Sequence, residues 1–173
     1  MNTTTWRVIP GFSMYEASTK NGIIRNAKTK HIMSPYWNTG YKFLILKNDE
    51  GVYKHGGVHQ FVALTYIDEY TLEEFYSKNK TFMIDHIDGT RHNNDLSNLR
   101  VLTNSENQKS YHNIKQTDPD LAKRNAHNGI WYTINDDHTF NFHRSWYMAN
   151  DEAPGKEIYF QEYGMNVKPE IVK

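Results

Sequence analysis

A short apolar run that ends in an adjacent carboxylate and imidazole, at Asp85 and His86, constrains this chain more than any other feature. Residues 81–84 are apolar and aromatic enough to form a buried strand, and a polar turn follows them. Residues 99–102 are a second strand-like run, so the two segments can pair as a hairpin with a long connection. That pairing would bring Asn98 back beside His86.

A helix is expected directly after the second strand. Thr103 and Glu106 have the spacing of a capping box, in which a hydroxyl and a carboxylate satisfy free amides at a helix start. The predicted helix runs from about residue 104 to about residue 113, with Asn107 near its first turn. The expected local unit is therefore strand, loop, strand and helix.

The spacing of these polar residues resembles the HNH nuclease motif. Asn98 follows His86 by twelve positions and Asn107 follows nine positions later, as in the variant whose last histidine is an asparagine. The string DHIDGTRHNNDLSNLRVLTNSENQ is similar to that of HNH homing endonucleases encoded by bacteriophages and of their free-standing relatives. The resemblance implies an antiparallel hairpin followed by a helix, with one divalent metal held between strand and helix.

Phosphodiester hydrolysis suggests a role for each residue of this set, because it needs a base, a cation and help for the leaving oxygen. His86 can be neutral at physiological pH and accept the proton of the attacking water. Asn98 could accept a hydrogen bond from the other ring nitrogen and so fix the tautomer. Asp85 and Asn107 offer hard oxygen ligands, which favour one Mg²⁺ or Mn²⁺ per active site over zinc.

The same segment allows other interpretations. A lone Asp-His pair is more often a surface turn than a catalytic pair, and only the full set favours catalysis. A calcium loop of the EF-hand type is excluded, because Ile87 and Gly89 stand where oxygen ligands are needed. His92, Asn93 and Asn94 are interpreted as loop residues that make turns rather than as catalytic groups.

The N-terminal sequence resembles the small module that precedes HNH domains in phage homing endonucleases and that is associated there with DNA binding. The similarity lies in residues 6–12, 15–18 and 21–26. Asn21-Gly22 is a strong signal for a tight turn between two short strands, and residues 41–47 are a further strand.

Residues 57–67 carry apolar side chains at helical spacing. The segment resembles the helix that packs against the nuclease hairpin in this family. It contains His59 and Gln60, where the family often has His-Arg. Whether His59 has a functional role or is a surface or packing residue of this helix stays open at this point.

Charge is distributed unevenly along the chain. The whole sequence has 20 basic and 20 acidic residues, but residues 1–48 hold seven Lys or Arg against one acid, a formal charge of +6. Double-stranded DNA is the expected partner, since neutralising phosphates supplies much of protein–DNA affinity. The candidate DNA-binding residues are Arg7, Lys20, Arg25, Lys28, Lys30, Lys42 and, within the motif, Arg100.

We expect an α+β chain with three parts and an elongated outline, because the mean hydropathy is low at −0.81. Residues 1–50 would form the N-terminal antiparallel β module, residues 51–115 the ββα-metal nuclease domain and residues 116–173 a C-terminal β-rich element. The last part is predicted to contain three or four short strands, one of them at residues 146–148, and a short helix at residues 118–124. DNA contact by this part is left open.

The function most consistent with these observations is a metal-dependent DNA endonuclease that nicks one strand, with a DNA-binding protein that does not cleave as the alternative. The chain has no cysteine, which excludes thiolate zinc ribbons and disulfides. It shows no signal peptide and no membrane-length apolar run, so the expected location is the cytoplasm, that of a bacterial host if the protein is phage-encoded. A monomer is expected, with a dimer as the alternative.

Overall fold

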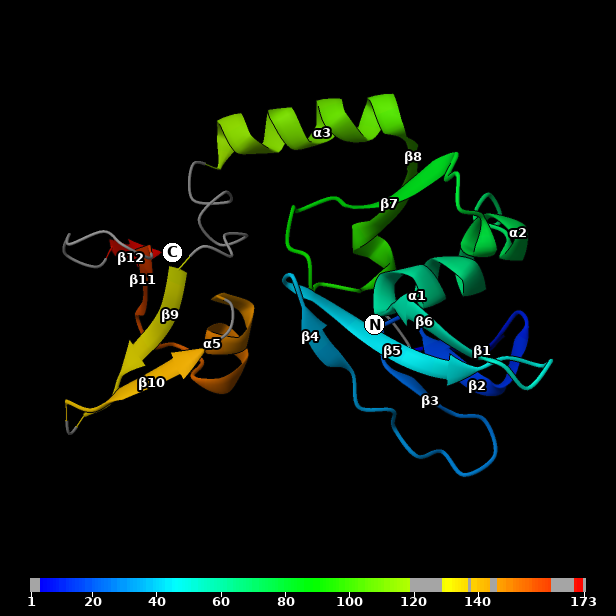
Figure 1. The fold of residues 1–173 in the computed structure, drawn as a ribbon, viewed down its shortest axis with the longest axis horizontal. Coiled ribbons are helices and arrows are strands. Elements are labelled where there is room, and N and C mark those ends of the chain that lie inside the picture. Colours follow the sequence, from blue (N-terminus) through cyan, green and yellow to red (C-terminus); the bar gives the residue numbers. More distant parts are fainter. Residues whose placement is uncertain (1–3, 119–128, 137, 144–145, 163–169, 173) are drawn as a thin grey trace. The chain divides into compact units, whose positions relative to one another are not determined.

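The computed structural model describes residues 4–118, 129–136, 138–143, 146–162 and 170–172 (Figure 1). The chain divides into two compact units, Met1–His112 and Asn113–Lys173. Small antiparallel sheets and short helices make up both units, so the predicted α+β class is confirmed. Within the described residues, no helix is long and apolar enough to cross a lipid bilayer.

The first unit opens with a three-stranded antiparallel sheet in the order β1-β2-β3. Its strands are β1 (Trp6–Ile9), β2 (Phe12–Ser18) and β3 (Ile24–Asn26). Asn21 and Gly22 connect β2 to β3 with φ angles of 59° and 60°. Two consecutive positive φ angles are typical of the tight hairpin turn that Asn-Gly favours, as the sequence predicts.

A second three-stranded antiparallel sheet, in the order β4-β5-β6, leads into two helices. These elements are β4 (Tyr36–Asn38), β5 (Tyr41–Lys47), β6 (Tyr53–Gly57), α1 (Val58–Tyr66) and α2 (Leu72–Tyr76). The predicted strand at residues 41–47 and the predicted helix at residues 57–67 are both found.

One hydrophobic core holds these layers together. The ring of Phe12 on β2 packs edge-on against Phe61 of α1 at 5.3 Å and against Phe75 of α2 at 5.7 Å, measured between ring centroids. The same core cluster includes Leu44 of β5 and Leu99 of β8. The boundary predicted near residue 50 is therefore not a division of the core, because α1 buries its apolar face against both sheets.

The nuclease hairpin follows the two helices. It consists of β7 (Phe82–His86), the short 3₁₀ helix η1 (Leu96–Asn98) and β8 (Leu99–Thr103), with Asp85 opposite Arg100 and His86 opposite Leu99. The predicted capping box is present, since the Thr103 amide donates to Glu106 Oε2 at 2.9 Å and the Glu106 amide donates to Thr103 Oγ1 at 3.4 Å. Helix α3 (Asn104–Thr117) begins there and is four residues longer than predicted.

The second unit is a four-stranded antiparallel sheet in the order β10-β9-β11-β12, with a helix packed on it. Its elements are β9 (Gly129–Ile134), β10 (Phe140–His143), α5 (Trp146–Glu152), β11 (Ile158–Glu162) and β12 (Glu170–Val172). The strand predicted at residues 146–148 is wrong, because this segment begins helix α5. Burial of Ala149 against Trp131 outweighs the strand propensity of the two aromatic residues that start it. Apart from Asp118, the helix predicted at residues 118–124 lies outside the described residues.

Candidate active site

His86 ends strand β7 and is buried, with 5% of its surface exposed. Its Nε2 atom lies 3.1 Å from Oδ1 of Asn94. A carboxamide oxygen only accepts hydrogen bonds, so Nε2 carries the ring proton and Nδ1 keeps a lone pair. The imidazole is therefore held in the tautomer that leaves Nδ1 able to accept a proton.

The surroundings of His86 also favour its neutral form. Burial lowers the pKa of His86 below its ordinary value of 6.5, and this effect outweighs the opposite effects of the Asn94 hydrogen bond and of the Asp88 and Asp85 carboxylates. A lowered pKa means that the imidazole is unprotonated at physiological pH. Such a ring is ready to act as a general base.

Asn98 does not take the position that the sequence suggested for it. Its Oδ1 accepts from the amide of Asp88 at 3.0 Å, and its Nδ2 donates to Asp88 Oδ1 at 3.0 Å and to the Asn93 carbonyl at 2.9 Å. The side chain thus closes the loop between the two strands instead of orienting the His86 ring. The reason is that Asn98 ends the η1 turn, which directs its carboxamide into the loop.

Asn94 contacts the His86 ring although the sequence analysis interpreted it as a turn residue. The residue is 1% exposed, and the Asn21-Gly22 turn of the first sheet lies directly on it. A Cβ atom on Gly22 would come within 2.5 Å of the Asn94 Cβ atom. No local motif predicts this contact, because the two segments are far apart in the sequence.

The two predicted metal ligands lie on facing elements, β7 and α3. Oδ2 of Asp85 accepts from Nε of Arg100 at 2.8 Å and from Oγ of Ser110 on α3 at 2.9 Å. Asn107 lies one helical turn before Ser110, on the same face of α3. The contact between Ser110 and Asp85 therefore shows that this face of the helix is turned toward the carboxylate.

Oxygen atoms remain available on both residues. No hydrogen bond from a described residue reaches Oδ1 of Asp85 or the carboxamide of Asn107. Across the described part of the chain, no group of three or more His, Asp, Glu or Cys side chains is arranged so that it could hold a metal ion. The donor set fits one hard divalent cation that keeps several waters, and it does not fit a closed zinc centre.

Several predicted DNA-binding cations lie on aromatic rings. The guanidinium of Arg25 is 3.6 Å from the ring centroid of Trp6, that of Arg7 is 5.2 Å from Tyr66, and Nζ of Lys42 is 4.9 Å from Trp37. These contacts restrict the conformations of the three side chains, and each side chain keeps its positive charge.

The other predicted cations divide into exposed and paired groups. Lys20 and Lys28 are exposed on the first sheet and its following loop. Lys30 and Arg25 share the Glu16 carboxylate at 3.0 and 2.8 Å, and their hydrogen bonds, that of Lys30 first, lower the pKa of Glu16. Arg100 pairs with Asp85 inside the site and does not point freely into solvent.

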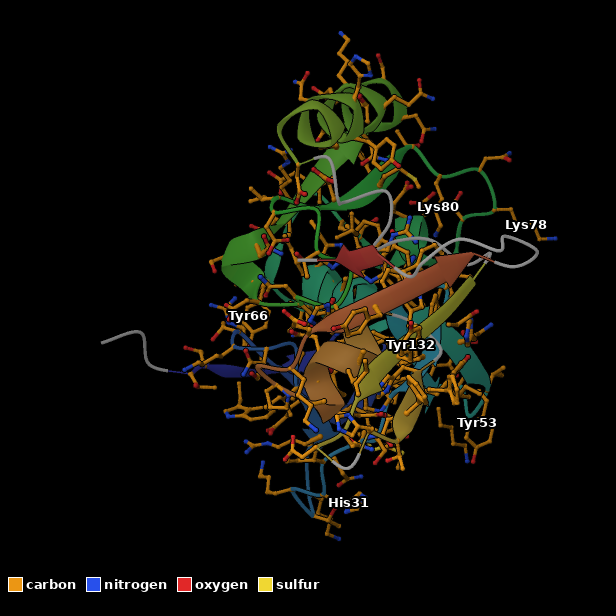
Figure 2. The ribbon with its side chains drawn as sticks, turned by 90° about the vertical axis from the view of Figure 1, so that its left-hand side faces the viewer. His31, Tyr53, Tyr66, Lys78, Lys80 and Tyr132 are labelled. Carbon is orange, nitrogen blue, oxygen red and sulfur yellow. The ribbon has the colours of Figure 1, made fainter. Side chains whose placement is uncertain are left out.

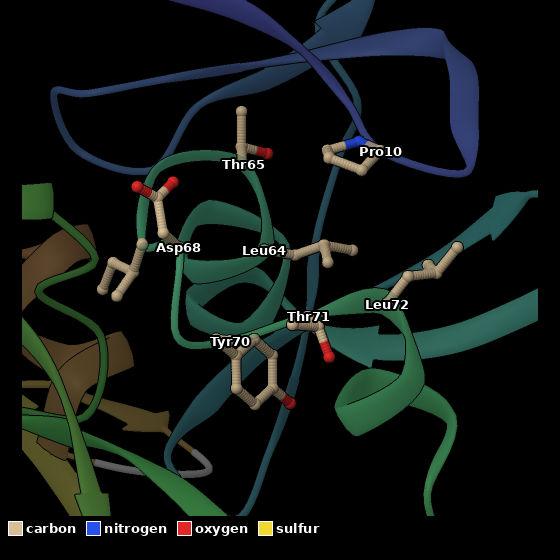
Figure 3. Close-up of a pocket in the computed structure, with 8 residues that line it drawn as sticks. Pro10, Leu64, Thr65, Asp68, Tyr70, Thr71 and Leu72 are labelled. Carbon is tan, nitrogen blue, oxygen red and sulfur yellow. The ribbon is translucent and has the colours of Figure 1, made fainter.

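A pocket of about 220 Å³ is found elsewhere in this unit, lined by Pro10, Leu64, Tyr70 and Leu72 among others (Figure 3). It lies at the C-terminal end of α1, whereas His59 and the His86 ring lie at the N-terminal end. Nine helical residues separate the two ends by roughly 13 Å. The pocket is therefore not part of the catalytic constellation.

Comparison with family models agrees with the site described above. A family model described as HNH endonuclease matches residues 76–109, which span the hairpin, the loop and the first turn of α3. This chain is also similar to a solved structure that is titled "DNA binding and cleavage by the HNH homing endonuclease I-HmuI". The two sequences are 25% identical, the alignment covers 86% of this chain and 83% of the other chain, and the TM-score is 0.48. No curated protein matches.

The hairpin and helix, with an acid and a histidine at the strand end, define a nuclease of the ββα type. The match over the same residues identifies the segment 76–109 as similar to an HNH endonuclease domain. Enzymes of this family generally use a divalent metal ion.

Proposed function

We propose that this chain is a homing-type, metal-dependent DNA endonuclease in which His86 activates water for hydrolysis of a phosphodiester bond. The observation that carries the proposal is the buried imidazole of His86, whose tautomer is set by Asn94 at 3.1 Å. Binding DNA without cleaving it would need neither a buried neutral imidazole nor the oxygen donors next to it.

The reaction begins with a water molecule beside the free Nδ1 of His86. Nδ1 accepts a proton from the water as its oxygen attacks phosphorus, and the bond from phosphorus to the leaving oxygen breaks. The imidazolium that forms is favoured by the negative charges of Asp85 and Asp88. Asn94 remains hydrogen-bonded to Nε2 throughout and preserves the ring direction.

The other residues of the motif hold the site together. Asp85 and Asn107 would bind one Mg²⁺ or Mn²⁺, and the bound ion would stabilise the charge that develops on the phosphate and on the leaving oxygen. Asn98 keeps the loop closed around Asp88, and Arg100 fixes the direction of the Asp85 carboxylate.

Double-stranded DNA is the proposed substrate, bound through its phosphates by the basic residues of the N-terminal sheets. One such site cuts one strand per engagement, so we expect nicking by a monomer and double-strand breaks only through a second event or a dimer. The proposed phosphate contacts are Arg7, Lys20, Arg25, Lys28, Lys30 and Lys42.

The test is cleavage of supercoiled plasmid or phage DNA at low salt with Mg²⁺, with Mn²⁺ or with EDTA. Wild type is compared with His86→Ala and with His138→Asn, a control at an exposed histidine whose φ of 64° asparagine tolerates. We expect metal-dependent nicking by wild type and by the control, and none by His86→Ala. DNA binding without cutting by wild type would favour the non-cleaving alternative, and nicking in EDTA would refute the mechanism.

A further inference from the structure

A second histidine lies against the catalytic one. His59 is the second residue of α1, and its ring centroid is 5.2 Å from that of His86, with an angle of 64° between the ring planes. Tyr41 of β5 completes the group, at 5.2 Å from His59 and 5.9 Å from His86. Three separate elements thus bring three rings into mutual contact around the proposed base.

Gly57 determines where the His59 ring can lie. Its φ of −67° and ψ of 144° are accessible to every L-residue, so the backbone itself does not require glycine here. A Cβ atom at this position would come within 2.5 Å of Cε1 and 2.9 Å of Nδ1 of His59, and its three nearest atoms all belong to that ring. The His59 ring therefore lies directly against Gly57, in space that the side chain of any other residue at position 57 would occupy.

Packing, and not hydrogen bonding, holds this ring. Within the described residues, the buried Nδ1 atom of His59 has no hydrogen-bond partner. Burial, followed by the proximity of His86, lowers the pKa of His59 from 6.5 to about 3. His59 is therefore neutral at physiological pH and too weak a base to take over the role of His86.

Among the described residues, the hydrogen bond between Nε2 of His86 and Asn94 is accompanied by two ring contacts, from His59 at 5.2 Å and from Tyr41 at 5.9 Å, so His59 is the nearer ring. A single hydrogen bond sets the tautomer but leaves rotation about the bond axis open, whereas an adjacent ring blocks it. General-base catalysis depends strongly on this orientation, and a displacement of about 1 Å can lower a rate on the order of 100-fold.

We propose that His59 is a positioning residue for His86, and that its ring, seated on Gly57, fixes the plane in which the His86 imidazole meets the attacking water. This inference rests on the proposed function of His86 as the general base. It assigns a catalytic purpose to the Gly57 and His59 pair, which lies outside the matched residues 76–109.

The experiment is a double-mutant cycle on the full chain, with single-turnover nicking rates and DNA affinity measured for each variant. His59→Ala removes the ring, and Gly57→Ala adds a methyl group that must displace it. Each change should lower the cleavage rate between about 10-fold and 100-fold, while the KM for DNA changes less than about twofold. His59→Phe, which keeps a planar ring without its nitrogens, should recover most of the lost rate.

The decisive variant carries both alanine substitutions. When the His59 ring is absent, the methyl group that Gly57→Ala adds has no ring to displace. The double variant should therefore be no slower than His59→Ala alone. Losses that multiply would show that the two residues act separately and would overturn the proposal. Failure of His59→Phe to recover the rate would also overturn it, because packing would then not be the role of the ring.

Controls separate this proposal from the proposed function. Tyr53→Ala changes a ring that is 69% exposed on β6 and points into solvent (Figure 2), and it should leave nicking and thermal unfolding at wild-type values. A wild-type rate in His59→Ala, together with an inactive His86→Ala, would refute only the positioning role. An active His86→Ala would instead refute the general base itself.

Discussion

Asn98→Ala should destabilise the first unit far more than an ordinary loop substitution. Asn98 is 8% exposed, and its side chain makes three hydrogen bonds. It accepts one from the Asp88 amide at 3.0 Å and donates one to the Asp88 carboxylate at 3.0 Å and one to the Asn93 carbonyl at 2.9 Å. Two neutral bonds contribute about 1 kcal/mol each and a bond to a charged group about 1.5 kcal/mol or more. The expected loss of unfolding free energy is therefore roughly 3 to 4 kcal/mol.

Urea unfolding followed by tryptophan fluorescence measures this loss. The first unit contains Trp6 and Trp37, and the ring of Trp37 is 5.8 Å from His92 in the same loop, so its emission reports on that loop. Ser97→Ala is the matched control, because Ser97 is exposed and makes one side-chain hydrogen bond of 3.3 Å. It should change the unfolding free energy by about 0.5 kcal/mol or less.

A loss below about 1 kcal/mol for Asn98→Ala, similar to the control, would refute the reasoning. It would mean that solvent replaces these hydrogen bonds at little cost and that the loop does not depend on Asn98. The ¹⁵N chemical shifts of His86 in the same variant would then show whether the Asn98 carboxamide, rather than that of Asn94, sets the tautomer of the ring.

Three further predictions concern acidity and packing. Because burial lowers the pKa of His86 below 6.5, the acid limb of the nicking rate should lie below pH 6.5, and a pH–rate profile with its limb at 7 or above would contradict this. Folded His59 stays neutral down to about pH 3 while the unfolded chain protonates near 6.5, so stability should fall by about 1.4 kcal/mol per pH unit below 6.5. Urea titrations between pH 7 and 5 should show a shallower fall for His59→Phe, and equal slopes would refute the assignment. Gly22→Ala places a side chain at a φ of 60° and 2.5 Å from Asn94, so it should lower both the melting temperature and the nicking rate, whereas an unchanged rate would mean that the turn does not support Asn94.

The sequence by itself determined the local elements of the site. The Asn21-Gly22 turn, the Thr103 capping box and the paired strands around His86 depend on contacts between residues close in the chain. Turn residues with positive φ, capping side chains and apolar runs carry their physical cause within a few positions. The HNH motif is also readable from the sequence, because the spacings of its residues follow from the hairpin and the helix that carry them.

Only the tertiary structure decided which carboxamide meets the His86 ring. Asn94 and Asn98 are chemically identical, and the choice between them depends on a turn more than seventy residues upstream that buries Asn94. The shared core of the two β sheets and α1, and the seating of His59 on Gly57, likewise arise from distant surfaces packing together. Such contacts leave no periodic or local signal, since their free energy comes from burial between segments whose separation in the chain is arbitrary.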